Sequence, residues 1–360
     1  MFQPTVCDDR SMGSGAGDVE PRPLLVRLPN WLGDLVLAWP VVEAAAREGA
    51  LFVGPAPFEP ILLARFPRAR YLAWRRERRY ALVGAIRAAR PRTALLLTES
   101  FSSALLAALS GIPERIGYAA EGRGFLLTRR VAREAPARTT PRSAEYRPLA
   151  HAARLSAPPG ESELAATNGE RDAARDLLAR HRSEGAASNE GAAGGRGGYL
   201  VVAPGAAYGP AKQWGGVNFG EAAAAIARER RLTTVAVGSF SDRTASAETV
   251  AVVRGAGEPA LDVTGVTDLP ALIGIVAGAA IVLTNDSGVM HLAAALGRPT
   301  VAIFGSTSPL WTSTSAPWVR NLYAAYPCSP CYRRSCAIGY GCLRAIPPAA
   351  AIEAARQLIG

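Results

Sequence analysis

The sequence predicts an α/β protein with two parallel sheets that carry helices on both faces. Each half of the chain opens with an apolar strand, then a turn rich in glycine and proline, and then a helix. Strands that alternate with helices favour parallel sheets. A Gly/Ala/Ser tract at 183–198 separates two halves of similar length, which suits a chain too long for one ordinary domain. We therefore expect a ligand cleft between the halves, at the carboxyl ends of their strands.

The first half is expected to contain a strand over Pro23–Leu28, a turn over PNWLGD and a helix over Leu35–Arg47. Residues 1–20 lack an apolar core of signal-peptide length, so we expect a disordered extension rather than a secretion signal. The longest charge-free apolar stretch, Leu269–Asn285, is shorter than a membrane span and fits a helix followed by a strand. The protein is therefore expected to stay in the cytoplasm.

The second half continues the same alternation. Its first strand, Tyr199–Ala203, leads into a long Gly-rich loop and a helix that starts near Asn218, where Asn218 and Glu221 resemble a capping box. Residues 346–360 are expected to form a C-terminal helix. The other predicted elements are the strands Thr233–Val237, Ile281–Thr284 and Thr300–Phe304 and the helices Leu269–Val276 and Val289–Leu296, the last ended by Gly297.

The net charge of +10 is concentrated in the first half. Residues 21–182 contain 26 arginines against 15 acidic residues, a net of +11, whereas residues 199–345 carry +3. This pattern indicates an anionic partner such as nucleic acid, phospholipid or a phosphorylated glycan, and an Arg-rich solvated surface is the alternative. Among the 40 basic residues only Lys212 is a lysine, which suggests that a compact ammonium group is needed there.

The first polar motif is Asn30-Trp31-Leu32-Gly33-Asp34, in the first strand-to-helix turn. Open α/β sheets bind ligands at such turns. Asp34 falls at or before the first helical turn, where the helix dipole favours an ionised carboxylate that can accept a proton from a hydroxyl. The alternative is that Asp34 only caps the helix.

Two further motifs lie in the second half. The loop PGAAYGPAKQW (204–214) combines small residues, which expose backbone N–H groups to an anion, with the charge of Lys212. It matches neither the Walker A nor the G-x-G-x-x-G pattern, and an ordinary surface loop is the alternative. The segment TNDSGVMH (284–291) leads from a strand into a helix whose N-terminus can hold a phosphate. Ser287 and His291 share one face of that helix, and a purely structural histidine is the alternative.

Four of the five cysteines, Cys328, Cys331, Cys336 and Cys342, form a C-x2-C-x4-C-x5-C cluster. In a cytosolic protein such a cluster favours zinc over disulfides. The spacing is tighter than that of a zinc ribbon, so a reduced, packed loop is the alternative. The cluster is therefore a possible structural zinc site, and no other metal site is assigned.

Together these blocks resemble the ADP-heptose:lipopolysaccharide heptosyltransferase family, and its heptosyltransferase II branch most of all. The matching stretches, in order, are VRLPNWLGDLVLAWP, APGAAYGPAKQW, VTGVTDLPALIGIVAGAAIVLTNDSGVMHLAAALGRPTVAIFGSTSP and PCSPCYRRSC. The weakest match covers about Arg65–Gly198. In the cysteine cluster, Ile338-Gly339-Tyr340 stands where a histidine after the glycine is expected, which argues against a Cys/His metal site.

The resemblance implies an inverting glycosyltransferase with the GT-B architecture, in which two Rossmann-like domains face a central cleft. It implies an acceptor-binding domain at 21–182, a linker or insertion at 183–198 and an ADP-heptose-binding domain at 199–345 with a Cys-rich loop at 328–342. The implied reaction moves L-glycero-D-manno-heptose from ADP-heptose to the heptosyl-Kdo inner core of lipopolysaccharide. No cofactor is implied, and the enzyme would work as a peripheral protein at the cytoplasmic face of the inner membrane.

The resemblance also implies roles for single residues. Asp34 matches the general base of the family, and Lys212 matches the residue that neutralises the donor phosphates. Asn30 and Trp31 are expected on the acceptor side. Neither cleft loop contains an Asp-x-Asp motif, which fits electrostatic stabilisation of the leaving diphosphate without an obligatory metal. The expected donor-binding residues are Gly205, Tyr208, Gly238, Ser239, Asp286, Ser287, Gly288 and His291.

Three alternative functions stay open. Another GT-B enzyme, either a heptosyltransferase for a protein acceptor or a nucleotide-sugar epimerase, would share the same cleft. A nucleic-acid-binding module would use the Arg-rich half and the cysteine cluster. The chain lacks zinc-ribbon spacing and basic runs interleaved with aromatics, so we expect no nucleic-acid partner. Asp34 and Lys212 argue against a non-catalytic scaffold.

Overall fold

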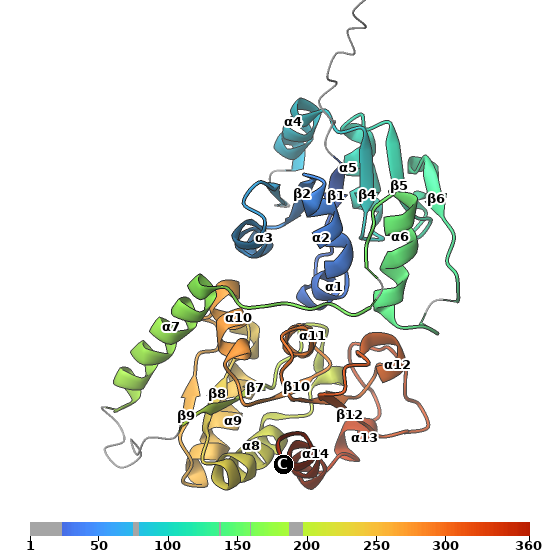
Figure 1. Cartoon of the computed structure of the whole chain (residues 1–360). Helices are drawn as coiled ribbons and strands as arrows, with labels where there is room; N and C mark the ends of the chain where they lie inside the picture. Colours follow the sequence, from blue (N-terminus) through green and yellow to red (C-terminus); the bar gives the residue numbers. More distant parts are fainter. Residues whose placement is uncertain (1–23, 75–78, 137, 159, 187–196) are drawn as a thin grey trace, which may run out of the picture.

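The computed structural model describes residues 24–74, 79–136, 138–158, 160–186 and 197–360. Within these ranges the chain forms two six-stranded parallel sheets, with helices between successive strands (Figure 1). The predicted α/β class is therefore confirmed. The expected N-terminal extension at 1–20 and most of the expected linker lie outside the described residues. None of the described helices has both the length and the apolar character of a membrane span.

The first sheet has the strand order β3-β2-β1-β4-β5-β6. The central strand β1 is buried, and its Leu25 pairs with Leu51 on one side and with Ala94 on the other. Its strands are β1 (Leu25–Arg27), β2 (Leu51–Pro55), β3 (Arg70–Trp74), β4 (Thr93–Leu96), β5 (Glu114–Tyr118) and β6 (Arg129–Val131). Its helices are α1 (Leu32–Leu37), α2 (Trp39–Arg47), α3 (Glu59–Arg65), α4 (Arg79–Ala89), α5 (Phe101–Leu109), the 3-10 helix η4 (Arg142–Tyr146) and α6 (Arg147–Ala152).

The second sheet has the order β12-β11-β10-β7-β8-β9, and its central strand β10 is buried along its whole length. Its strands are β7 (Tyr199–Ala203), β8 (Thr233–Ala236), β9 (Ala260–Asp262), β10 (Ile281–Asn285), β11 (Thr300–Phe304) and β12 (Val319–Tyr323). Its helices are α7 (Asn168–Ala186), α8 (Gly216–Arg230), α9 (Arg243–Gly255), α10 (Leu269–Ala277), α11 (Gly288–Ala295), α12 (Pro309–Thr312), α13 (Gly341–Arg344) and α14 (Pro348–Ile359).

The predicted strands are present, and β7 and β11 have the predicted limits. The predicted helix Leu35–Arg47 is in fact two helices, α1 and α2. The break falls at Ala38 because Pro40 has no N–H to donate and fits only the first turn of a helix. The predicted capping box at Asn218 is wrong. Helix α8 begins two residues earlier, and the Asn218 amide donates to the Trp214 carbonyl at 2.8 Å instead.

Helix α7 packs against α10 of the second sheet, although it begins inside the first expected domain (Figure 1). Residues 183–186 of the expected linker are part of this helix. The buried face of α7 carries Ala174, Leu177 and Leu178. The two helices touch at Gly274, where an added Cβ would lie 2.0 Å from the Glu170 carbonyl oxygen. The second sheet is therefore covered on this side by a helix that precedes it in the chain.

We predict that Gly274→Ala lowers the thermal unfolding midpoint. A methyl group at this contact must push the two helix backbones apart, and overpacking of this kind costs about 1–3 kcal/mol. The matched control is Gly84→Ala in α4, where an added Cβ meets nothing within 4 Å. Alanine is a better helix former than glycine by about 1 kcal/mol, so the control is expected to be neutral or stabilising. Equal midpoints for both variants would contradict the tight α7–α10 contact.

Candidate functional site

The two sheets meet through α1 and α11, each of which follows the central strand of its own sheet (Figure 1). A glycine on each helix permits the contact. A Cβ at Gly33 would lie 2.7 Å from Cδ2 of His291, and a Cβ at Gly288 would lie 3.0 Å from Cβ of Leu32. The first polar motif and the 284–291 motif, which are far apart in sequence, therefore lie side by side.

Asp34 lies in the first turn of α1 and does not cap that helix. The N-cap residue is Trp31, and it makes no side-chain capping bond. The Asp34 carboxylate instead accepts a hydrogen bond from Nε of Arg142, with Oδ1 at 2.6 Å. The carboxylate keeps 21% of its side-chain surface exposed. A capping role therefore does not explain this residue.

The expected acceptor-side residues precede α1. The Trp31 side chain is 56% exposed, and Oδ1 of Asn30 accepts a hydrogen bond from Nη2 of Arg27 at 2.7 Å. Arg27 is buried, and burial lowers its pKa to about 10. The structure thus holds Asn30 in place with a buried cation and leaves the Trp31 ring open to a partner.

Lys212 and Asp286 form a buried ion pair on the side of the second sheet. Nζ of Lys212 donates to Oδ2 of Asp286 at 2.5 Å, and the two side chains are 11% and 3% exposed. The hydroxyls of Thr307 and Thr312 donate to the same oxygen at 2.5 and 3.1 Å. The Lys212 ammonium also lies 5.0 Å from the centre of the Tyr208 ring. The only lysine of the chain is therefore fixed inside the protein, so its loop is not an ordinary surface loop.

Asn285 fastens the Gly-rich loop to the end of β10. Its side-chain oxygen accepts from the Trp214 N–H at 3.1 Å, and its nitrogen donates to the Pro204 and Gly205 carbonyls at 2.7 and 3.2 Å. The side-chain NH2 and the side-chain oxygen of this buried amide both bond to backbone groups of the loop. These bonds fix the path of the loop before any ligand binds.

Gly205, Gly238 and Ser239 gather around the Asp242 carboxylate. A Cβ at Gly205 would lie 2.1 Å from Cγ of Asp242, and one at Gly238 would lie 3.0 Å from its Cβ. The backbone N–H and the hydroxyl of Ser239 donate to Oδ2 of Asp242 at 2.8 and 2.6 Å. Close packing alone thus explains the glycines, and their part in donor binding stays a prediction.

The helix α11 begins at the expected donor turn. Ser287 is its N-cap residue and accepts from the Val289 N–H at 3.3 Å. His291 is buried, and among the described residues its Nδ1 has no hydrogen-bond partner. Burial lowers the pKa of His291, and this effect outweighs the attraction of Asp286 and Asp34. The imidazole is therefore neutral near pH 7, with one ring nitrogen unused.

Sequence reasoning missed Arg142, which bonds to Asp34, and the two residues Glu145 and Trp311 that contact Arg142. Arg142 and Glu145 come from η4, and Trp311 comes from α12 of the other sheet. Nε1 of Trp311 donates to Oε1 of Glu145 at 3.1 Å. These contacts join positions separated by 108 and 166 residues, so no local motif could reveal them. The excess of arginine in the first half was the only signal.

The cysteine cluster is not assembled as a metal site. Among the described residues, no group of three or more His, Cys, Asp or Glu side chains is placed to hold a metal ion. Cys328 is exposed and Cys342 is buried, and all four cysteines are free thiols. Backbone N–H groups, first that of Tyr340, lower the pKa of Cys336. The structure therefore does not support the possible structural zinc.

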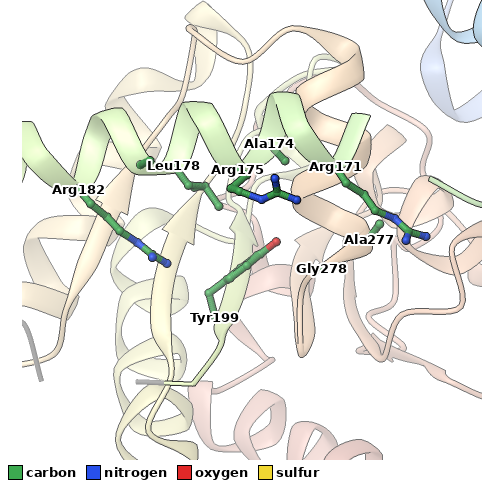
Figure 2. Close-up of a pocket in the computed structure, with 10 residues that line it drawn as sticks. Arg171, Ala174, Arg175, Leu178, Arg182, Tyr199, Ala277 and Gly278 are labelled. Carbon is green, nitrogen blue, oxygen red and sulfur yellow. The ribbon is translucent and has the colours of Figure 1, made fainter. Parts of the chain in front are cut away.

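A separate cavity of about 510 Å³ lies between α7, α10 and the start of β7 (Figure 2). Arg171, Arg175 and Arg182 of α7 line it together with Tyr199. None of the expected site residues lines this cavity, so it is not the site predicted from the sequence.

The family model for glycosyltransferase family 9 (heptosyltransferase) matches residues 79–340 of the chain. The chain belongs to glycosyltransferase family 9. The lipopolysaccharide heptosyltransferase 2 of Salmonella typhimurium is 30% identical to it over 310 residues, which are 80% of this chain and 84% of the relative. The enzyme of the same name from Escherichia coli is 29% identical over 311 residues, with the same shares covered.

Solved structures agree with this assignment. The ADP-heptose lipopolysaccharide heptosyltransferase II of Escherichia coli superimposes with a TM-score of 0.75 at 26% identity, covering 94% of this chain and 98% of that one. A family 9 glycosyltransferase of Veillonella parvula gives a TM-score of 0.72 at 19% identity, covering 94% and 97%. The expected GT-B arrangement of two Rossmann-like sheets and the resemblance to the heptosyltransferases are confirmed, and the chain is a glycosyltransferase.

The neutral state of His291 in this glycosyltransferase predicts how its stability changes with pH. Because the folded-state pKa is lowered, only the unfolded chain takes up this proton just below pH 6.5, so stability falls as the pH falls. A one-proton difference is worth at most about 1.4 kcal/mol per pH unit. We expect the drop in thermal midpoint from pH 7.5 to 5.5 to be smaller in His291→Gln than in the parent. The control His181→Gln, on α7, is expected to keep the parental drop, and identical drops in all three proteins would refute the argument.

Proposed function

We propose that the protein is an inverting heptosyltransferase, which moves L-glycero-D-manno-heptose from ADP-heptose to the heptosyl-Kdo inner core of lipopolysaccharide. The observation that carries this proposal is the contact of α1 with α11, which brings the helix that carries Asp34 against the helix start to which we assign donor binding. The names of the similar proteins, lipopolysaccharide heptosyltransferase 2 and ADP-heptose lipopolysaccharide heptosyltransferase II, support the choice of donor and acceptor.

Asp34 acts as the general base in this proposal. An inverting displacement needs one group that takes the proton from the attacking hydroxyl on the acceptor. Oδ1 of Asp34 is held by Arg142, and among the described residues Oδ2 has no hydrogen-bond partner. The second oxygen is thus available to the acceptor. Asn30, the exposed Trp31 and the cationic first half would hold that anionic acceptor.

Lys212 and the start of α11 would stabilise the departing ADP. Asp286 and two threonine hydroxyls hold the Lys212 ammonium in place, so its charge is positioned before the diphosphate leaves. The N-terminus of α11 adds first-turn backbone N–H groups, which have no partner within a helix, and the positive end of a helix dipole. The residues assigned to the donor are Gly205, Tyr208, Gly238, Ser239, Asp286, Ser287, Gly288 and His291.

These groups supply the base and the charge stabilisation, so the proposed reaction requires no cofactor. A lipid-linked acceptor would place the enzyme at the cytoplasmic face of the inner membrane as a peripheral protein. The direct test is incubation with ADP-heptose and separate acceptors, followed by mass spectrometry. Addition of one heptose to heptosyl-Kdo lipid A supports the proposal. Transfer only to a protein, or conversion of the donor without transfer, would replace it with one of the alternatives.

We predict that Asp34→Asn lowers turnover by about a hundred- to ten-thousand-fold, the usual cost of losing a general base. Asparagine keeps the size of the side chain and an oxygen that can accept from Arg142, so the thermal midpoint is expected to change little. Donor affinity, measured by calorimetry with ADP, is expected to stay near the parental value. Asp34→Ala serves as the comparison for loss of the side chain, and turnover of Asp34→Asn within a few-fold of the parent would remove Asp34 from the mechanism.

We predict that Lys212→Ala weakens donor binding and also lowers the thermal midpoint. A charge-assisted contact to phosphate is worth about 1.5–3 kcal/mol, and the variant leaves the buried Asp286 carboxylate without its cation. Lys212→Arg is expected to restore only part of the activity, because the larger, planar guanidinium group cannot replace a compact ammonium group in this enclosed position. Full activity in the arginine variant would show that lysine is not specifically needed.

A further inference from the structure

The proposed base is held by one arginine. Nε of Arg142 donates to Oδ1 of Asp34 at 2.6 Å, and both side chains are about four-fifths covered. Among the described residues, Tyr146 of η4 and His291 of α11 also interact electrostatically with the Asp34 carboxylate. Glu145 of η4 pairs with Arg142. Arg142 is the one that bonds to Asp34 directly.

Arg142 is in turn held by a residue of the other sheet. Its Nη1 donates to Oε2 of Glu145 at 3.4 Å, and Oε1 of the same carboxylate accepts from Nε1 of Trp311 at 3.1 Å. The Arg142 guanidinium also lies 5.5 Å from the centre of the Trp311 ring. The contacts therefore run without a break from Trp311 through Glu145 and Arg142 to Asp34, and they cross from one sheet to the other.

We propose that Arg142 is a positioning residue for Asp34, and that Trp311 of the donor-side sheet keeps Arg142 in place. The role given to Asp34 rests on the proposed function. It follows that the base takes up its working orientation only when both halves of the protein are together in this arrangement.

Arginine suits this task because its donors lie in one rigid plane. It bonds one carboxylate through Nε and a second through Nη1, whereas a lysine ammonium cannot reach both in the same way. Burial tends to lower the pKa of Arg142, but Tyr146, Asp34 and Glu145 outweigh burial and raise it, so the group stays cationic. Without it, the Asp34 carboxylate can rotate away from the acceptor. A misplacement of about 1 Å can cost a hundredfold in rate.

The first test is kinetic. Arg142→Gln is expected to lower kcat about 10- to 100-fold with the KM for ADP-heptose within about twofold of the parent, and Arg142→Lys to recover part of the loss. Trp311→Ala is expected to lower kcat too, and Trp311→Phe less, because a ring against Arg142 is kept. The double variant Arg142→Gln/Trp311→Ala is expected to resemble Arg142→Gln alone, since both residues act on the same carboxylate. Arg230→Gln, at an exposed arginine in the last turn of α8, is the control.

Two kinetic outcomes would overturn the proposal. One is a set of losses that multiply in the double variant, which would mean that the two residues act independently. The other is a fall in kcat that is matched by a fall in the thermal midpoint and that Arg142→Lys does not partly restore. Either result would leave Arg142 as a structural ion-pair partner.

The second test needs no catalytic activity. The ¹H–¹⁵N indole resonance of Trp311 can be identified by its loss in Trp311→Phe. Asp34→Asn and Arg142→Gln are expected to shift this resonance, and Arg230→Gln is not. An unmoved resonance in the first two variants would refute the connection from Trp311 to Asp34. Failure of the parent to transfer heptose would instead count against the proposed function, and the resonance would still decide this proposal.

Discussion

The close approach of α1 to α11 is the constraint on which the rest of the site depends. Gly33 meets the ring of His291, and Gly288 meets the side chain of Leu32. A larger residue at either glycine would hold the helices apart and move Asp34 away from Lys212 and the α11 N-terminus. Apolar residues of both halves form one continuous buried cluster around this contact. The active-site geometry proposed for this family 9 glycosyltransferase therefore depends on two glycines, Gly33 and Gly288, and on one hydrophobic core shared by both halves.

The charged groups of the proposed site lie in different environments in the two sheets, buried in the second and partly exposed in the first. The second sheet, to which we assign the donor, holds its cation internally, because Lys212 is paired with Asp286 and enclosed by threonine hydroxyls. The first sheet, to which we assign the acceptor, carries Asp34 with a partly exposed carboxylate and a nearby exposed tryptophan. This division suits the proposed transfer, in which a soluble nucleotide binds on one side and a large anionic glycolipid on the other. Cross-sheet contacts such as Trp311 with Glu145 then couple the two environments.

Local sequence patterns were enough for the α/β class, for five of the twelve described strands and for the positions of the main polar motifs. Short apolar runs bounded by turn residues, such as Tyr199–Ala203, favour buried strands. Asp34 and Lys212 each follow the first strand of their half, at the edge where a parallel sheet gathers its loops. Features that depend on tertiary contact could not be found this way. Arg142 and Trp311 lie in unremarkable segments, and their significance comes only from what the fold places beside them. The cysteine cluster shows the converse, because close spacing along the chain did not bring four thiols to one point in space.

Helix α7 changes where this protein can be divided. It precedes the second sheet in sequence, yet it covers the apolar face of α10 through Ala174, Leu177 and Leu178. A fragment of the second half that began at Tyr199 would expose that face to water, which favours self-association. A fragment that began ahead of Asn168 would keep the face covered, although Glu170 would lose Arg65, its bidentate partner from α3. By its packing, α7 belongs with the second half. A division that keeps this packing therefore lies before α7 and not in the Gly-rich tract at 183–198.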